Sequence, residues 1–205
     1  MSNEETRLVH VVDDDEAIRR SVGFALKTSG FQVRSYESGG ELLKASSNLE
    51  PGCILLDIRM PGMDGLEVQE ALKAKGVGFP VIIMTGHGDV SLAVKAMKAG
   101  AIDFIEKPFQ KAVLLSAIEQ AMGRLKNSAA NLKDANEAMV KLQLLTPRER
   151  EILQGLAKGL PNKSIAYDLG ISPRTVEIHR ANVMSKLGAR TLSDALRIAF
   201  AAEDR

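Results

Sequence analysis

Acidic, hydroxyl and basic side chains lie at the ends of short apolar runs within the first 107 residues of the chain. They are the acidic pair Asp13 and Asp14, the single acid Asp57, the hydroxyl of Thr85 and the amine of Lys107. Converging carboxylates raise each other's pKa unless a cation joins them, and oxygen ligands in an open site suit Mg²⁺. The lysine and the hydroxyl add a positive charge and a hydrogen-bond donor for a phosphoryl group in transfer. The set therefore predicts phosphoryl transfer to the Asp57 carboxylate.

Asp57 has an alternative interpretation as a helix N-cap, a position at which aspartate is favoured. Asp64 suits that position better, because it directly precedes the helical repeat of apolar residues that begins at Leu66. Asp57 instead ends a buried apolar strand, and ligands of an open α/β sheet bind outside the carboxyl ends of its strands. We therefore expect the Asp57 carboxylate to face the crevice where ligands bind.

Apolar runs of strand length alternate with segments of helical spacing from residue 8 to about residue 125. The expected strands cover residues 8–12, 31–36, 54–57, 81–85 and 102–105. A helix is expected after each strand, the third over residues 64–75 and the last over residues 113–125. This (βα)₅ pattern predicts an α/β fold of the flavodoxin type, a doubly wound parallel sheet with helices on both faces.

The last 64 residues predict a second, all-α domain with four helices. Thr146 suits an N-cap, Pro147 the first helical position and Glu149 the third, which together make a capping box. The helices that follow are expected over residues 162–169, 173–187 and 192–202. The second and third of the four helices are joined by a turn at Gly170. They make a helix-turn-helix motif over about residues 161–180, whose second helix enters the DNA major groove.

Residues expected on the outer face of this motif are the candidates for DNA contact. They are Asn162, Lys163, Arg174, Thr175, Glu177, Ile178, Arg180 and Ala181. Arginines, hydroxyls and the amides of a helix N-terminus suit phosphates, and Glu177 is able to accept a hydrogen bond from cytosine N4. A helix pair that only packs, or that binds protein or RNA, is the alternative.

A length of 205 residues suggests one or two domains, and the composition is that of a soluble globular protein with an uneven division of charge. The net charge of +1 divides into 17 basic and 19 acidic residues up to position 141, and 10 basic and 7 acidic residues after it. A basic C-terminal part favours nucleic acid as a partner. The single Cys53 excludes an internal disulfide. The sequence has no apolar stretch of about 18 residues and no signal-peptide pattern, so we expect a cytoplasmic protein with no membrane partner.

Residues 123–141 are expected to form a helical linker, because this stretch is rich in helix-forming residues and its one glycine lies at its start. Leu125, Leu132 and Met139 recur every seven residues, which is typical of a narrow apolar seam. Two heptads leave two interpretations open. The linker extends the fifth helix as a short coiled coil, or it is a solvated helix that packs on either domain.

The residues of the first domain, 7–122, resemble the receiver domain of two-component response regulators, which has the CheY-like fold. Asp13 and Asp14 match the acidic pair of that family, Asp57 its phosphoacceptor, and Thr85 its switch hydroxyl. The Lys107-Pro108 pair matches the lysine–proline motif of the family, for which the resemblance implies a cis peptide.

The resemblance also implies how a cation and the switch are arranged. Mg²⁺ would be held by Asp14, Asp57 and the main-chain carbonyl of Arg59, with Asp13 contacting it through water. Arg59 and His87 match variable positions that tune the lifetime of the phosphoryl group. Phe104 matches the aromatic switch position, although its simpler interpretation is an ordinary core residue of a strand.

The second domain, residues 142–205, resembles the LuxR-type output domain. The matching runs are residues 145–149, 159–166 and 172–180. A receiver joined to this output is typical of the FixJ/NarL group, and residues 85–89 and 99–109 are most similar to its FixJ members. This resemblance implies a transcription regulator phosphorylated by a sensor histidine kinase, monomeric until phosphorylation and then a homodimer on promoter DNA. It also implies activation of nitrogen-fixation genes, with an oxygen-sensing haem kinase as the partner.

An enzyme is the competing interpretation of the aspartate cluster. Phosphatases of the haloacid-dehalogenase type also use a strand-end aspartate, Mg²⁺, a threonine and a lysine, but they carry a second acid two residues after the nucleophile. Arg59 occupies that position here, which argues against the phosphatase. We therefore expect a protein that catalyses only its own phosphorylation and dephosphorylation, and no other reaction.

Overall fold

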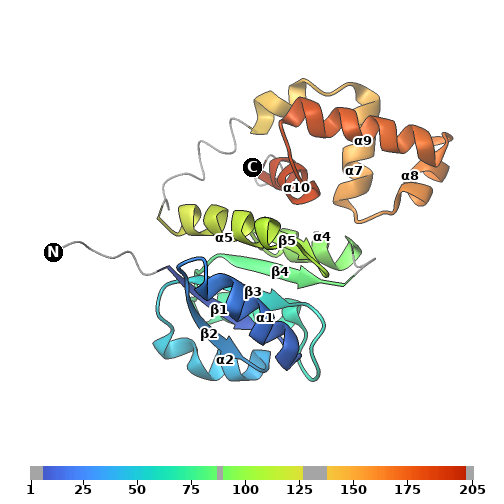
Figure 1. Ribbon diagram of the computed structural model, residues 1–205. Coiled ribbons are helices and arrows are strands. Elements are labelled where there is room, and N and C mark those ends of the chain that lie inside the picture. The colour runs from blue at the N-terminus through green and yellow to red at the C-terminus, as the bar shows by residue number, and fades with distance from the viewer. Residues whose placement is uncertain (1–6, 87–89, 127–137, 202–205) are drawn as a thin grey trace. The chain divides into compact units, whose positions relative to one another are not determined.

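The computed structural model of the chain describes residues 7–86, 90–126 and 138–201 (Figure 1). The chain forms two compact units, which are described separately below. One is built on a parallel sheet and the other is all helical, so the predicted fold class is confirmed. His87 and the middle of the expected linker, residues 127–137, lie outside the described residues. None of the helices in the described part of the chain has the length and hydropathy of a membrane span.

The sheet has five parallel strands in the order β2-β1-β3-β4-β5. They are β1 (Leu8–Val12), β2 (Gln32–Tyr36), β3 (Cys53–Asp57), β4 (Val81–Thr85) and β5 (Asp103–Glu106). The first crossover leads from β1 to β2 on one side, and the later strands follow on the other side of β1. The point at which the strand order reverses therefore lies between β1 and β3, where an open α/β sheet forms its ligand crevice.

Five helices alternate with these strands along the chain, and the fourth of them is grouped with the C-terminal unit. They are α1 (Glu16–Lys27), α2 (Gly39–Ala45), α3 (Gly65–Ala74), α4 (Val90–Lys98) and α5 (Lys111–Lys126). The core on one face of the sheet joins Val9, Val11, Leu55 and Ile82 of the strands to Val22 and Leu26 of α1 and to Leu114 and Ile118 of α5. Alternate strand residues thus face α1 and α5, as the pleat of a strand requires.

Helix caps decide the ends of several elements. Asp64 is the N-cap of α3 and forms a capping box with Glu67, which confirms its predicted role and leaves Asp57 to the strand. The helix α5 begins at Lys111, two residues before the predicted start at Val113. The Gln110 carbonyl accepts hydrogen bonds from the Val113 and Leu114 N–H groups. This first turn is polar, so the apolar repeat did not reveal it.

The C-terminal unit contains the four predicted helices after a helical segment at residues 138–143. They are α7 (Pro147–Ala157), α8 (Asn162–Leu169), α9 (Pro173–Leu187) and α10 (Leu192–Ala201), as Figure 1 shows. Their core joins Leu145, Leu153, Val183, Leu187, Ala195 and Ala199. The predicted capping box of Thr146 and Glu149 is present at the start of α7. The turn after α8 is made by Gly170, which has a left-handed backbone with φ of 63°.

Candidate functional site

Strand register brings the predicted acidic residues to one edge of the sheet. Val12 of β1 pairs with Leu56 of β3, so Asp13 and Asp57, each the next residue, end side by side. Oxygen atoms of Asp13, Asp14 and Asp57 lie within 4.8 Å of one another. Asp13 is fully buried and Asp57 is 5% exposed, whereas Asp14 is open to solvent. Three carboxylates open on one side fit a divalent cation such as Mg²⁺, which takes oxygen ligands and keeps several waters.

Lys107 joins the two buried carboxylates of this cluster. Its Nζ lies 2.7 Å from Asp13 Oδ2 and 2.8 Å from Asp57 Oδ1. The cis Lys107–Pro108 peptide is present, and the Lys107 N–H donates to the Thr85 carbonyl at 2.8 Å, which fixes where the lysine leaves the sheet. Burial alone would lower the pKa of Lys107, but its hydrogen bonds to the two carboxylates outweigh burial and raise that pKa. The amine is therefore charged at neutral pH.

Asp57 is held in an environment that does not favour its charge. Burial raises the pKa of Asp57, the hydrogen bond and charge of Lys107 oppose that rise, and the charges of Asp13 and Asp14 add to it. A cation at the three carboxylates would offset both burial and repulsion. The cluster thus has an excess of negative charge, which a divalent cation would balance.

Strand register and burial describe where the other predicted residues of this site lie. Thr85 is buried and follows Met84, the β4 residue that pairs with Asp57; its hydroxyl makes a long contact of 3.4 Å with the Gly86 carbonyl. Phe104 is half-buried on β5, opposite Ile83. Arg59 is exposed two positions after Asp57. The structure therefore places Thr85 at the same end of the sheet as Asp57. The roles of Thr85 and Phe104 in the switch and the carbonyl ligand at Arg59 stay predictions.

One residue that contacts the acidic loop was not among the predicted site residues. Arg19 on α1 donates from Nη1 to the carbonyls of both Asp13 and Asp14. A signal for it exists in the sequence. A cation near the start of a helix is disfavoured by the helix dipole, so an arginine there calls for another partner.

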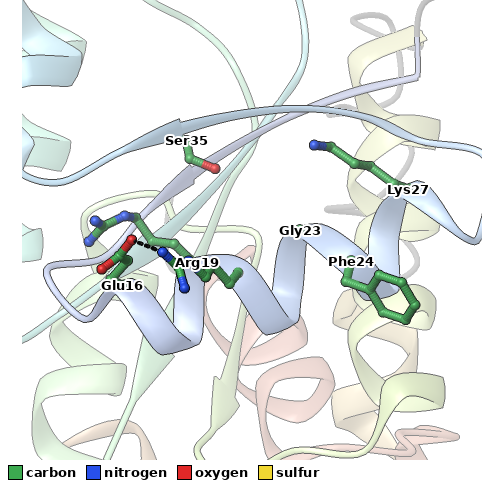
Figure 2. A pocket seen from close by; sticks show the side chains of 7 residues that line it. Glu16, Arg19, Gly23, Phe24, Lys27 and Ser35 are labelled. Atoms are coloured by element: carbon green, nitrogen blue, oxygen red, sulfur yellow. Dashed lines mark hydrogen bonds and ion pairs between the residues drawn. The ribbon is translucent and has the colours of Figure 1, made fainter.

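A hollow of about 390 Å³ lies along α1 and does not coincide with the acidic cluster. Figure 2 shows it between α1 and Ser35 of β2, with Glu16, Phe24 and Lys27 along the helix. It is an open groove whose charged residues are partly paired with each other, as Arg20 is with Glu16. The acidic cluster, which has converging ligands for a cation, is the site at which chemistry is expected.

The predicted DNA-contacting residues lie on α8 and α9 of the C-terminal unit. Those exposed to solvent are Lys163, Arg174, Glu177, Ile178 and Ala181, and those half-buried are Asn162, Thr175 and Arg180. On the inner side of α9, Val176, Val183 and Leu187 are buried as predicted. The predicted contact residues of α9 therefore lie on the side of the helix opposite its buried residues.

Several polar groups of this face are bonded to one another. Arg174 Nη1 lies 3.3 Å from Glu177 Oε2, and Arg180 Nη1 donates to Asn162 Oδ1 at 2.8 Å. The Thr175 hydroxyl lies 2.8 Å from Ser172 Oγ, and its N–H donates to the same oxygen as part of the helix cap. The bond between Arg180 and Asn162 joins the middle of α9 to the start of α8, so both helices contribute to one surface.

Two families match the chain where these two groups of residues lie. The response regulator receiver domain matches residues 9–119, and the bacterial regulatory proteins of the luxR family match residues 143–199. The chain therefore belongs to the response regulators that join a receiver to a LuxR-type helix-turn-helix domain. This family consists of transcription regulators rather than enzymes. The receiver implies a histidine kinase as partner, and the output domain implies DNA binding.

Relatives match along nearly the whole chain. The transcriptional regulatory protein FixJ of Rhizobium meliloti is 49% identical over 193 residues, which are 94% of this chain and 95% of FixJ. The C4-dicarboxylate transport transcriptional regulatory protein DctR of Rhodobacter capsulatus is 43% identical over 93% of this chain and 98% of its own. A crystal structure of full-length FixJ from B. japonicum superposes with a TM-score of 0.59 at 45% identity, covering 96% of this chain and 97% of that one.

Proposed function

We propose that Asp57 is the phosphoacceptor of this regulator and that its phosphorylation produces a homodimer that binds promoter DNA. One observation carries the proposal: Lys107 bridges the buried carboxylates of Asp13 and Asp57 at 2.7 and 2.8 Å beside the exposed Asp14. Mg²⁺ held by Asp14, Asp57 and the Arg59 carbonyl, with Asp13 through water, would neutralise charge on the incoming phosphoryl oxygens. Lys107 neutralises a further oxygen as a fixed cation.

Thr85 and Phe104 are proposed to carry the signal away from Asp57. Among the residues that the structure describes, the Thr85 hydroxyl makes only a long contact, so it is available to a phosphoryl oxygen on the neighbouring strand. When Thr85 turns toward that oxygen, the space it leaves admits the half-buried Phe104 ring. Such a rearrangement couples a local charge to a surface for a second copy. Shifting a switch from mostly off to mostly on takes about 5.5 kcal/mol of differential stabilisation.

DNA recognition is proposed to use the outer face of α8 and α9. Lys163, Arg174 and Arg180 suit phosphates, and Asn162 and Thr175 support them at the two helix starts. Glu177, Ile178 and Ala181 are left for base edges, as an acceptor for cytosine N4 and as apolar contacts for a thymine methyl group. Two output domains in a dimer would read half-sites about one helical turn apart.

The regulon is proposed to include nitrogen-fixation genes, with this chain as their activator. Similarity to FixJ along nearly the full length supports this assignment. The similarity to DctR is only six percentage points lower, from 49% to 43%, so a regulon for dicarboxylate transport is the second candidate.

One experiment tests the phosphorylation switch in the full chain. A small phosphodonor such as acetyl phosphate with Mg²⁺ should give an acid-labile, hydroxylamine-sensitive label, a dimer in sedimentation and tighter binding to DNA selected from a random library. Asp57→Asn should abolish all three changes. The matched control is Asp64→Asn, because asparagine also caps a helix and label should persist. Label that survives in Asp57→Asn would refute the assignment, and tighter DNA binding without a dimer would refute the dimer.

A further inference from the structure

Arg19 is the side chain that touches the main chain of the acidic pair. It is half-buried on α1, and its Nη1 lies 2.8 Å from the Asp13 carbonyl oxygen and 2.9 Å from that of Asp14. One nitrogen with two N–H groups therefore holds two successive peptide groups. Figure 2 shows Arg19 on α1, one turn from the start of the helix.

The contacts of this loop differ between its two acids. Asp13 is held three ways: Asp15 donates its N–H to Oδ1 at 2.9 Å, Lys107 donates to Oδ2, and its own N–H donates to the Tyr36 carbonyl at 3.3 Å. The carboxylate of Asp14, in contrast, is exposed to solvent. Its direction depends on the orientation of the main chain that carries it, which is what Arg19 holds.

We infer that Arg19 is a positioning residue for the cation site, because it fixes the Asp13 and Asp14 peptides so that both carboxylates point into the crevice. The direction of a Cα–Cβ bond follows from the planes of the adjacent peptides, and a peptide whose carbonyl is bonded to α1 cannot turn toward the crevice. This inference rests on the proposed function, in which Asp14 binds Mg²⁺ directly. Partners that hold metal ligands in this way typically contribute 10- to 100-fold to metal affinity.

The role of Arg19 depends on the position of its guanidinium and not only on its charge, and Arg20 is a matched control for this difference. Arg20 carries the same charge one residue further along α1, but it points to the surface and pairs with Glu16. Replacing either arginine by glutamine removes one positive charge near the cluster. Only Arg19→Gln removes the bonds to the two carbonyls.

The test measures Mg²⁺ affinity of the full chain by NMR titration, and phosphorylation of Asp57 by acetyl phosphate over a range of Mg²⁺ concentrations. Arg19→Gln should raise the Mg²⁺ dissociation constant by about 10-fold or more, and labelling should recover at saturating Mg²⁺. Arg19→Lys keeps a cationic N–H donor at this position and should restore most of the affinity. Arg20→Gln should match the wild type in both measurements.

Unchanged Mg²⁺ affinity in Arg19→Gln would overturn the inference, and so would equal weakening in Arg20→Gln, which would show an effect of charge alone. A wild-type chain that neither binds Mg²⁺ nor accepts label would instead refute the proposed function. If Arg19→Gln does not fold, hydrogen exchange of the guanidinium protons in the wild-type chain tests the inference instead. Those of Arg19 should exchange slowly with water and those of Arg20 rapidly, and rapid exchange at Arg19 would overturn the inference.

Discussion

The acidic cluster and the outer face of α9 show two ways in which a fold prepares a site. In the cluster, strand register sets Asp13 beside Asp57, and Lys107 holds both at fixed distances away from solvent. On α9 the functional groups share one exposed face, and Arg174 and Glu177 pair with each other. The first site is assembled by the chain itself, whereas the second is a surface that a partner must complete.

Because of this difference, substitutions at the two sites should change the free energy of unfolding by different amounts. Removing one member of a buried charged group leaves its partner without compensation, which is strongly destabilising. An exposed ion pair contributes about 0–1 kcal/mol, so a phosphate group readily replaces it. We therefore expect substitutions around the cluster to change stability and function together, and substitutions on the exposed outer face of α9 to change function alone.

The largest loss of stability is expected from Gly65→Ala, because the added Cβ would collide with the main chain at Asp57 in the acidic cluster. A Cβ at Gly65 would lie 2.5 Å from the Asp57 carbonyl oxygen and 2.8 Å from Ile58 Cα, and main-chain atoms of a buried strand end cannot move aside. We expect a loss of about 3 kcal/mol in the free energy of unfolding. Urea denaturation measures the loss, and labelling by acetyl phosphate should fall with it because Asp57 is displaced.

Gly123→Ala is the control for this substitution. Gly123 lies within α5, and apart from its chain neighbours and the main chain of its own helix, a Cβ there would meet no atom of the described residues within 4 Å. Alanine is favoured over glycine inside a helix by roughly 0.5–1 kcal/mol, so this variant should be as stable as the wild type or more so. If Gly65→Ala unfolded no more easily than Gly123→Ala, the close approach of α3 to the Asp57 main chain would not constrain the site.

The same contrast explains what the sequence was able to predict. Apolar runs and strand-end residues predicted the sheet and the grouping of Asp13, Asp57 and Lys107, because parallel strands bring their carboxyl ends to one edge. Capping patterns predicted the starts of α3 and α7 at Asp64 and Thr146, because a cap is a local property of the chain.

Contacts between distant residues were not predictable from these patterns. The bond between Lys186 and Glu149 joins α9 to α7 across 37 positions, and no periodicity encodes it. The pairing of Arg180 with Asn162 likewise depends on how α8 meets α9. An arginine on a helix face has more than one plausible partner in the sequence. Which partner it bonds can be predicted only when the packing of the helices is known.

A loss of stability of intermediate size is expected at Glu149, a buried charged residue in the helical unit that carries the second site. Glu149 is 4% exposed and accepts hydrogen bonds from Lys186 Nζ at 2.7 Å and from the Thr146 N–H at 2.8 Å. The bond from Lys186, followed by that from the Thr146 main chain, lowers the pKa of Glu149. Lys186→Met should therefore cost about 2 kcal/mol at neutral pH, as expected for a hydrogen bond to a charged group.

The pH dependence of this effect has a definite sign. Because the pKa of Glu149 is lower in the folded state than in the unfolded state, its stabilisation is complete above the unfolded pKa of about 4.3. It is lost as the pH falls through the folded pKa. Urea denaturation followed at the Val183 methyl signals should thus show the two proteins converging in acid. Lys158→Met, which removes an exposed lysine near the end of α7, is the control, and a Lys186→Met deficit that persists unchanged in acid would contradict the assignment.

The smallest effect on stability, less than about 0.5 kcal/mol, is expected from Glu177→Ala, because Glu177 and Arg174 are both exposed. Its effect on DNA binding should be clear, since the variant loses a negative charge and frees Arg174 for a phosphate. Affinity for random DNA should rise, and the slope of log K against log salt should steepen by up to about 0.9, the value for one phosphate contact.

The preference for cytosine at the contacted base should weaken in Glu177→Ala, because its acceptor for N4 is gone. Arg174→Ala is the matched change on the other partner of the pair. It should weaken all DNA sequences alike and flatten the salt slope by a similar amount, with base preference unchanged. Binding to selected and random DNA, measured over a range of salt concentrations, separates the two roles. If Glu177→Ala weakened both kinds of DNA equally, Glu177 would support the helix rather than read a base, and the outer face of α9 would be prepared by its own ion pair much as the acidic cluster is.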